Sequence, residues 1–295
     1  MDQEKRVLLA FVLSIGMLAV WRIFFVKPPP PRNTPAPSIT TQPVTPAAGQ
    51  PAGPGAPAAA APKAAAVTLR VEQGTQPEDI VVESDLYRVT FSTRGAVVKS
   101  WVLKKYRDAS EQPLDVVDSA ACQTLGYPMS VNVMGADGTP DAALGQKLDT
   151  ALFVTRPSHT LFAAPDTVEF TYSDGAIQVK KRFTFEKTYE LHVEASVFDG
   201  QNYRPVEVRW PGGFGDHSLS YKLRDAANRT VYGAPGSLTT VVQVKLKEDR
   251  TIPGPLTLAG LEDRFFVAIF LPDSPDVFFG MDRRPWTPPD WKEGE

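Results

Sequence analysis

The sequence predicts an all-β fold, an antiparallel and twisted β-sandwich of a dozen or so strands, preceded by one transmembrane helix and a disordered linker. Three observations lead to this prediction. From Val67 onward apolar and polar residues alternate with a period of two, turn clusters separate the alternating runs, and no stretch shows a long amphipathic helical period. The 28 prolines are unevenly spread, because twelve of them fall between Lys27 and Ala66. The chain therefore has three unlike parts.

The first part is a predicted membrane anchor. After residues 1–6, residues 7–26 are apolar apart from Ser14, Gly16 and Arg22. Twenty helical residues span about 30 Å of hydrocarbon, which is enough to cross a bilayer. The apolar run ends without a small-x-small cleavage site, so we expect an uncleaved signal anchor that binds the lipid bilayer. Basic residues lie on both sides of the span, so charge alone does not decide its orientation.

The second part is a predicted disordered linker. Residues 27–66 contain twelve prolines, twelve alanines and no acidic residue, and they have nothing large and apolar with which to build a core. Such a segment is extended, at about 3.1 Å per residue where it adopts polyproline II. The linker can therefore hold a domain clear of the membrane.

The third part, residues 67–295, carries the strand pattern. Apolar residues alternate with polar ones over Tyr87–Phe91, Leu191–Val197 and Val242–Leu246, and each run predicts a half-buried strand with one wet face.

Two further runs predict strands of a different kind. Residues 177–185 continue the alternation, but Lys181 falls on the apolar side and indicates a strand edge, a bulge or a crevice. Phe265–Leu271 is apolar throughout and too short to cross a membrane as a helix. It predicts a strand covered on both faces.

Composition excludes several classes of function. Residues 67–295 hold 25 basic against 32 acidic residues, and this sign disfavours nucleic acid as a partner. Cys122 is the one cysteine, which excludes an intrachain disulfide, a CxxC redox pair and a cysteine zinc site.

The three histidines do not predict a catalytic, cofactor-binding or metal site, and we expect no cofactor. His192 lies on the polar face of a predicted strand, and His159 follows Pro157 in a predicted turn. His217 lies in the glycine-rich loop 212–218, between an aspartate and a serine, but adjacency in sequence supplies neither triad geometry nor an oxyanion hole.

Two tryptophans lie close to the end of the sequence, among prolines and acidic residues. Trp286 and Trp291 are better explained by a terminal segment that lies against the sandwich, or leads elsewhere, than by a ligand cage.

Three stretches resemble the amino-terminal half of the YidC membrane protein insertases. The most specific is Ile80–Tyr106, which reads IVVESDLYRVTFSTRGAVVKSWVLKKY. Val179–Ala195, VKKRFTFEKTYELHVEA, resembles the family's central strand pair, and Glu262–Pro272, EDRFFVAIFLP, resembles a late strand. They follow an apolar anchor and a Pro/Ala linker, in the family's order.

The resemblance implies a protein of the bacterial inner membrane. Residues 1–6 are then cytoplasmic, and residues 67–295 form a periplasmic β-super-sandwich of the galactose-mutarotase-like kind. The family's sandwich continues beyond the stretch that matches residues 286–295, so the resemblance implies a domain that is incomplete at its C-terminal end. Sec translocon components and nascent membrane proteins are the implied partners. The mutarotases' catalytic residues find no clear match here, so we expect no enzyme.

The same resemblance bounds the function. The family inserts proteins with five membrane helices that follow the periplasmic domain, and no apolar run after Val26 approaches eighteen residues. We expect these 295 residues to be the anchor and periplasmic part of an insertase, without the bundle that performs insertion. The alternative is a freestanding membrane-tethered module that binds a peptide or a glycan.

Overall fold

The computed structural model describes one part of the chain. The predicted cytoplasmic N-terminus, transmembrane helix and linker, residues 1–66, lie outside the described residues. The structure describes residues 67–135, 137–220, 223, 228–283, 286–289 and 291–292. Within these ranges no helix is both long and apolar enough to cross a membrane.

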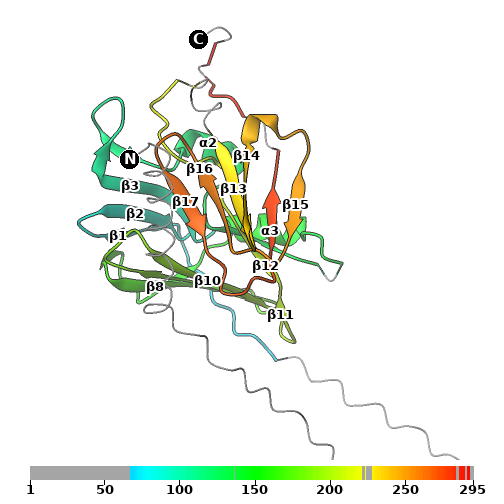
Figure 1. Ribbon diagram of the computed structural model, residues 1–295. Coiled ribbons are helices and arrows are strands. Elements are labelled where there is room, and N and C mark those ends of the chain that lie inside the picture. The colour runs from blue at the N-terminus through cyan, green and yellow to red at the C-terminus, as the bar shows by residue number, and fades with distance from the viewer. Residues whose placement is uncertain are drawn as a thin grey trace, which may run out of the picture. The chain divides into compact units, whose positions relative to one another are not determined.

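Two five-stranded sheets form the first half of the domain, and their labels follow Figure 1. Neighbouring strands are antiparallel except β1 and β7, which run parallel. The first sheet has the order β4 (Pro113–Asp115), β3 (Val97–Arg107), β2 (Tyr87–Ser92), β1 (Asp79–Glu83), β7 (Leu161–Ala163). The second has the order β11 (Tyr203–Arg204), β10 (Leu191–Phe198), β9 (Gln178–Phe185), β8 (Asp166–Ser173), β6 (Val154–Arg156).

Three smaller sheets and a few short helices complete the described part. The sheets are β12 (Val206–Arg209) with β5 (Ser130–Val133), the four-stranded β14 (Ser237–Val242), β13 (Arg229–Ala234), β16 (Leu258–Glu262), β17 (Val267–Phe270), and β15 (Arg250–Pro253) with β18 (Phe278–Met281). The helices are α2 (Ser119–Leu125), α3 (Ala142–Thr150) and the 3-10 turn η1 (Gln243–Lys245). Asp118 and Asp141 cap the two α-helices, because each side chain accepts a hydrogen bond from a first-turn N–H.

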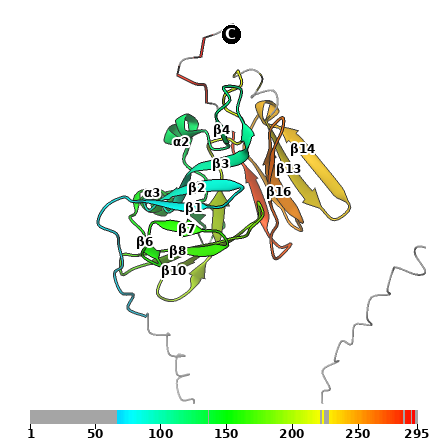
Figure 2. The ribbon, with the colours of Figure 1, turned by 90° about the vertical axis from the view of Figure 1, so that its left-hand side faces the viewer.

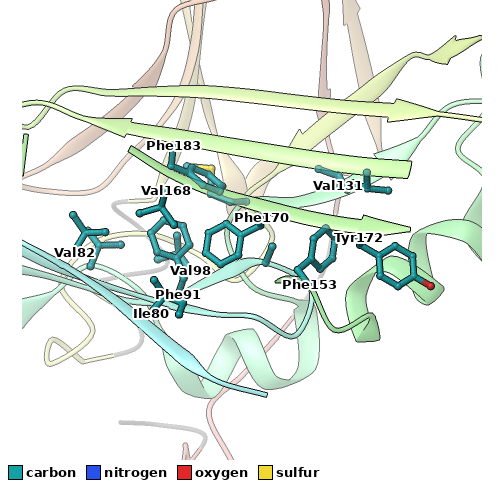
Figure 3. Close-up of a cluster of buried hydrophobic side chains, with 14 of the residues drawn as sticks. Ile80, Val82, Phe91, Val98, Val131, Phe153, Val168, Phe170, Tyr172 and Phe183 are labelled. Atoms are coloured by element: carbon teal, nitrogen blue, oxygen red, sulfur yellow. The ribbon is translucent and has the colours of Figure 1, made fainter. Parts of the chain in front are cut away.

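The two five-stranded sheets enclose the main core, as the stacked strands in Figure 2 show. Apolar side chains from both sheets point toward one another between them (Figure 3). The Phe91 ring lies 4.7 Å from the Phe183 ring and 5.4 Å from the Phe170 ring, measured between centroids. This arrangement confirms the predicted all-β sandwich and the half-buried strands at Tyr87–Phe91 and Leu191–Val197.

The prediction of one strand over Val242–Leu246 was wrong. Strand β14 ends at Val242, and the next three residues form η1. The backbone turns there because the Gln243 N–H donates to the Asn228 carbonyl and the Leu246 N–H donates to the Gln243 carbonyl. Leu246 is buried and Val244 is exposed, so the two residues do not share a strand face.

Lys181 marks neither a strand edge nor a bulge, and because it is buried it does not line an open crevice. It lies on β9, the middle strand of its sheet, in unbroken register with both neighbours, and its side chain is 2% exposed. Its Nζ donates to the carbonyls of Gly95 at 2.7 Å, Met129 at 2.9 Å and Ala96 at 3.2 Å. Three acceptors match the three donors of an ammonium group, so a charge can be buried here. Burial nevertheless lowers the pKa of Lys181 to about 7.

The predicted covering of Phe265–Leu271 on both faces was also wrong. Only Val267–Phe270 is strand, and β17 is an edge strand of its sheet. Phe270 packs toward the main core, whereas Val267 and Ile269 are exposed. The run therefore has one covered face and one open face, which its uniformly apolar sequence did not indicate.

Candidate functional site

A cleft of about 600 Å³ lies between the end of β4, the start of α2 and the loop that contains His217. Trp286 and Trp291 also line this cleft, so the described part of the terminal segment lies against the domain. This position agrees with the expectation that the tryptophans belong to a segment that covers the sandwich.

Carboxylates that line the cleft accept hydrogen bonds from nearby backbone N–H groups. The Asp115 carboxylate accepts hydrogen bonds from the N–H groups of Trp101 and Val117 and from the Ser100 hydroxyl. The Asp118 carboxylate accepts the first-turn N–H of α2. These side chains fix turns and a helix start, which explains their positions without a ligand.

The sequence Asp216-His217-Ser218 does not form a catalytic triad. The Ser218 hydroxyl donates to the Asp216 carboxylate at 2.5 Å and accepts the Ala109 N–H at 2.9 Å. His217 is oriented toward a different residue, with Nδ1 3.5 Å from the Asp118 carboxylate. A serine hydroxyl bound to its neighbouring aspartate is not bound to the imidazole that would have to activate it.

The glycines of the same loop have a packing role that sequence reasoning missed. Gly212 lies against Cys122 so closely that a Cβ would collide with the sulfur. Gly215 has φ +109 and lies against the Asp263 carboxylate, with no room for a Cβ. That carboxylate accepts the N–H groups of Asp216 at 2.9 Å and Phe265 at 2.7 Å.

The loop therefore joins the first half of the domain to the four-stranded sheet. The Gly215 N–H also donates to the Val116 carbonyl at 3.1 Å, and the Tyr106 ring at the end of β3 lies 5.1 Å from the Phe266 ring beside β17. The sequence does not indicate this contact, because glycine-rich loops and single aspartates are common and Gly215 and Asp263 lie far apart in the chain.

The two other histidines lie on β10 and beside β7, and Cys122 lies in the core behind Gly212. His192 is exposed on the wet face of β10, and His159 lies outside the strands with its ring 4.0 Å from the Phe162 ring. Cys122 is buried in the core, and burial followed by the charge of Asp118 raises the pKa of its thiol to about 12. In the described ranges no three histidine, cysteine or acidic side chains are grouped to hold a metal ion.

The comparisons with known proteins identify the family. The family model described as "YidC periplasmic domain" matches residues 79–283. The chain belongs to the YidC family. Two relatives named membrane protein insertase YidC align with most of the chain. The relative from Syntrophus aciditrophicus is 25% identical to this chain over 296 residues, and the relative from Syntrophobacter fumaroxidans is 29% identical over 291 residues.

Coverage differs strongly between the chain and these YidC relatives. The alignments cover 93% and 91% of this chain but 51% and 49% of the relatives, so the chain spans about half their length. The insertase of Geobacter metallireducens is 32% identical over 192 residues, which is 62% of this chain and 32% of that protein.

One solved structure that matches this chain is the crystal structure of a galactose mutarotase-like protein from Lactobacillus casei. It has 13% sequence identity and a TM-score of 0.40, and it covers 69% of this chain and 86% of its own.

Proposed function

We propose that the 295 residues are the anchor and periplasmic region of a YidC-type insertase, which takes part in the insertion, folding and assembly of membrane proteins in the bacterial inner membrane. The observation that supports this proposal is the match of residues 79–283 to the family's periplasmic domain. Relatives named membrane protein insertases align with more than nine-tenths of the chain.

The proposed topology assigns each part of the chain to a compartment. Residues 1–6 are cytoplasmic, residues 7–26 cross the inner membrane once, residues 27–66 are the linker, and residues 67–295 lie in the periplasm. The apolar run and the proline content support the middle two assignments. Residues 67–295 contain one cysteine, and the core between the two five-stranded sheets is large enough to be stable in the periplasm without a disulfide.

The proposed role is binding and not catalysis. In the cleft the acidic side chains are engaged in turns and a helix cap, and the Ser218 hydroxyl donates to Asp216. Within the 295 residues no apolar run of eighteen follows Val26. In this proposal the insertion step therefore depends on membrane helices outside these residues.

Photocrosslinking during membrane protein synthesis tests the proposal. The experiment uses inner-membrane vesicles that contain the protein encoded by the natural gene. Ribosomes are added that carry a stalled membrane protein with a photoreactive residue in its first apolar segment. We expect a crosslinked product that an antibody against residues 67–295 recognises. A stalled cytosolic protein is the control, and equal crosslinking of both proteins, or of neither, would contradict the proposal.

Complementation tests the division of labour. In insertase-depleted cells we expect no growth from the 295 residues alone, and growth when they are joined to the second half of the Syntrophus aciditrophicus relative. Growth with the 295 residues alone would show that insertion needs no further helices. In the same cells, affinity purification of the chimera should recover Sec translocon components.

A further inference from the structure

We propose that the outer edge of β17 binds an extended apolar polypeptide segment, which adds to the four-stranded sheet as a fifth strand. The assignment of that segment to a membrane protein in transit rests on the proposed function. The name β17 stripe is used here for the exposed side chains of Phe265, Val267, Ile269 and Leu271.

The backbone of β17 presents free hydrogen-bonding groups at this edge. The four-stranded sheet ends with β17, so within the described residues no strand pairs with its outer side. The turn before it is closed by the Asp263 N–H, which donates to the Phe266 carbonyl at 3.0 Å. Hydrogen-bonded and non-hydrogen-bonded pairs alternate in an antiparallel ladder, so the pairs Glu262↔Val267 and Gly260↔Ile269 are of the second kind. Val267 and Ile269 therefore direct their N–H and C=O groups outward.

The side chains at the same positions are apolar and open to solvent. Phe265 is 61% exposed, Val267 54%, Ile269 40% and Leu271 72%. Val267 and Ile269 share one face of β17, and Phe265 and Leu271 flank the strand at the same spacing of two residues. The Ile269 side chain lies over Gly260, whose missing Cβ leaves room for it. An exposed edge strand can pair with another extended chain, and apolar side chains beside the edge strengthen that tendency.

The opposite edge of the same sheet is different. Strand β14 lies at that edge (Figure 1), and among its exposed residues only Leu238 is apolar, while Ser237 and Thr240 are hydroxylic. Both edges offer backbone groups, but only β17 adds a continuous apolar stripe. The two edges therefore form a matched pair for experiment.

The chemistry of the edge favours an extended peptide as the occupant. A lipid surface cannot bond the outward N–H and C=O groups, whereas a peptide strand bonds both. The open area of the β17 stripe is about 400 Å², taking side-chain areas of about 150–250 Å², and a stable dimer needs about 800 Å² from each partner. Residues 67–295 carry 32 acidic against 25 basic side chains, and this net negative charge disfavours a second copy as the partner. Asp273 and Asp276 lie just beyond Leu271 and favour a peptide with a basic end.

A binding measurement on the 295-residue protein in nanodiscs tests the proposal. The probe is a fluorescent peptide of alternating valine and threonine with a lysine at each end. We expect saturable binding of this peptide to the wild type. Ile269→Lys should weaken the binding about tenfold or more, because a charged side chain on an edge strand opposes pairing with a further strand. Leu238→Lys, on the β14 edge, should leave the affinity unchanged. Both positions are exposed, so circular dichroism and thermal unfolding should match the wild type.

A second probe separates strand addition from simple apolar contact. In this peptide alternate backbone nitrogens are methylated, which removes one row of donors and keeps the side chains. We expect its binding to be lost. Equal binding of both peptides, or equal loss in the Ile269→Lys and Leu238→Lys proteins, would overturn the proposal. So would wild-type dimerisation in sedimentation that Ile269→Lys abolishes, or Ile269-dependent binding to phosphatidylglycerol vesicles that the peptide does not displace.

Failure of this inference and failure of the proposed function give different results. If stalled membrane proteins crosslink equally to the wild type and to Ile269→Lys, the β17 edge is not their site and the insertase role stands. If the peptide binds as described but no stalled membrane protein crosslinks, the edge binds strands and the insertase role is refuted.

Discussion

Replacing Lys181 by methionine tests the interpretation of the buried ammonium group. The Lys181 side chain joins β9 to the Gly95, Ala96 and Met129 carbonyls, and Ala96 and Met129 have positive φ although neither is glycine. Methionine has a similar length and no donor, so it removes the bonds and keeps most of the packing.

The expected magnitude follows from the acceptors that lose their donor. Each buried acceptor left without a partner costs about 1–3 kcal/mol. At pH 8 the neutral amine already has only two donors, so at least two bonds are lost, and better apolar contact offsets part of the loss. We expect the free energy of unfolding to fall by about 3 kcal/mol.

Urea denaturation of the wild-type and variant proteins measures this difference. The matched control is Lys180→Met on the exposed face of the same strand, which should change stability by less than about 0.5 kcal/mol. Equal stabilities for the two variants would refute the interpretation of Lys181 as the group that holds the three carbonyls.

Three further predictions concern the same domain. The pKa of Lys181 in the folded protein, about 7, lies below its ordinary value of 10.5. Between these pH values the unfolded chain binds more protons than the folded protein, so the free energy of unfolding should rise with pH. Urea denaturation at several pH values should show this rise in the wild type and a flatter profile in Lys181→Met. Gly215→Ala should lower the free energy of unfolding by about 3 kcal/mol, because the added Cβ collides with the Asp263 carboxylate. The control is Gly213→Ala, which also has positive φ but has open space around it and should cost about 1 kcal/mol. Equal losses of stability in thermal unfolding would count against the collision. Cys122 should not react with iodoacetamide at pH 8 in the native protein and should react after unfolding, as mass spectrometry can measure, because burial raises its pKa to about 12; rapid native labelling would contradict the buried position.

The strand pattern was predictable where core-facing apolar residues alternate with solvent-facing polar residues. Tyr87–Phe91 and Leu191–Val197 alternate because every second side chain enters the space between the two sheets. A period of two records that burial directly, and it needs no knowledge of the partner strand.

Lys181 and Phe265–Leu271 were not predictable, for opposite reasons. Lys181 looked out of place because its three acceptors come from segments about 50 to 90 residues away in the chain, and residue spacing carries no information about such contacts. The β17 run looked covered because it is apolar throughout, whereas the structure leaves one of its faces open. Apolar character records a tendency to be buried, and it does not say what covers the residue.

The cleft was only partly predictable. The sequence predicts that Trp286 and Trp291 belong to a terminal segment that lies against the sandwich or leads elsewhere, and both tryptophans line the cleft together with His217 of the glycine-rich loop. The joint between Gly215 and Asp263 was missed because 48 residues separate the two positions. The family resemblance, by contrast, rests on local stretches, and the match over residues 79–283 confirms it.

We propose that newly made membrane proteins contact this domain at the β17 edge during their insertion, and site-specific crosslinking from the two edges of the four-stranded sheet tests that contact. A photoreactive amino acid replaces Ile269 in one protein and Leu238 in another, and each is illuminated in cells during membrane protein synthesis. We expect crosslinks to newly made membrane proteins from position 269 and few from position 238. Crosslinks from neither position, or equally from both, would contradict it.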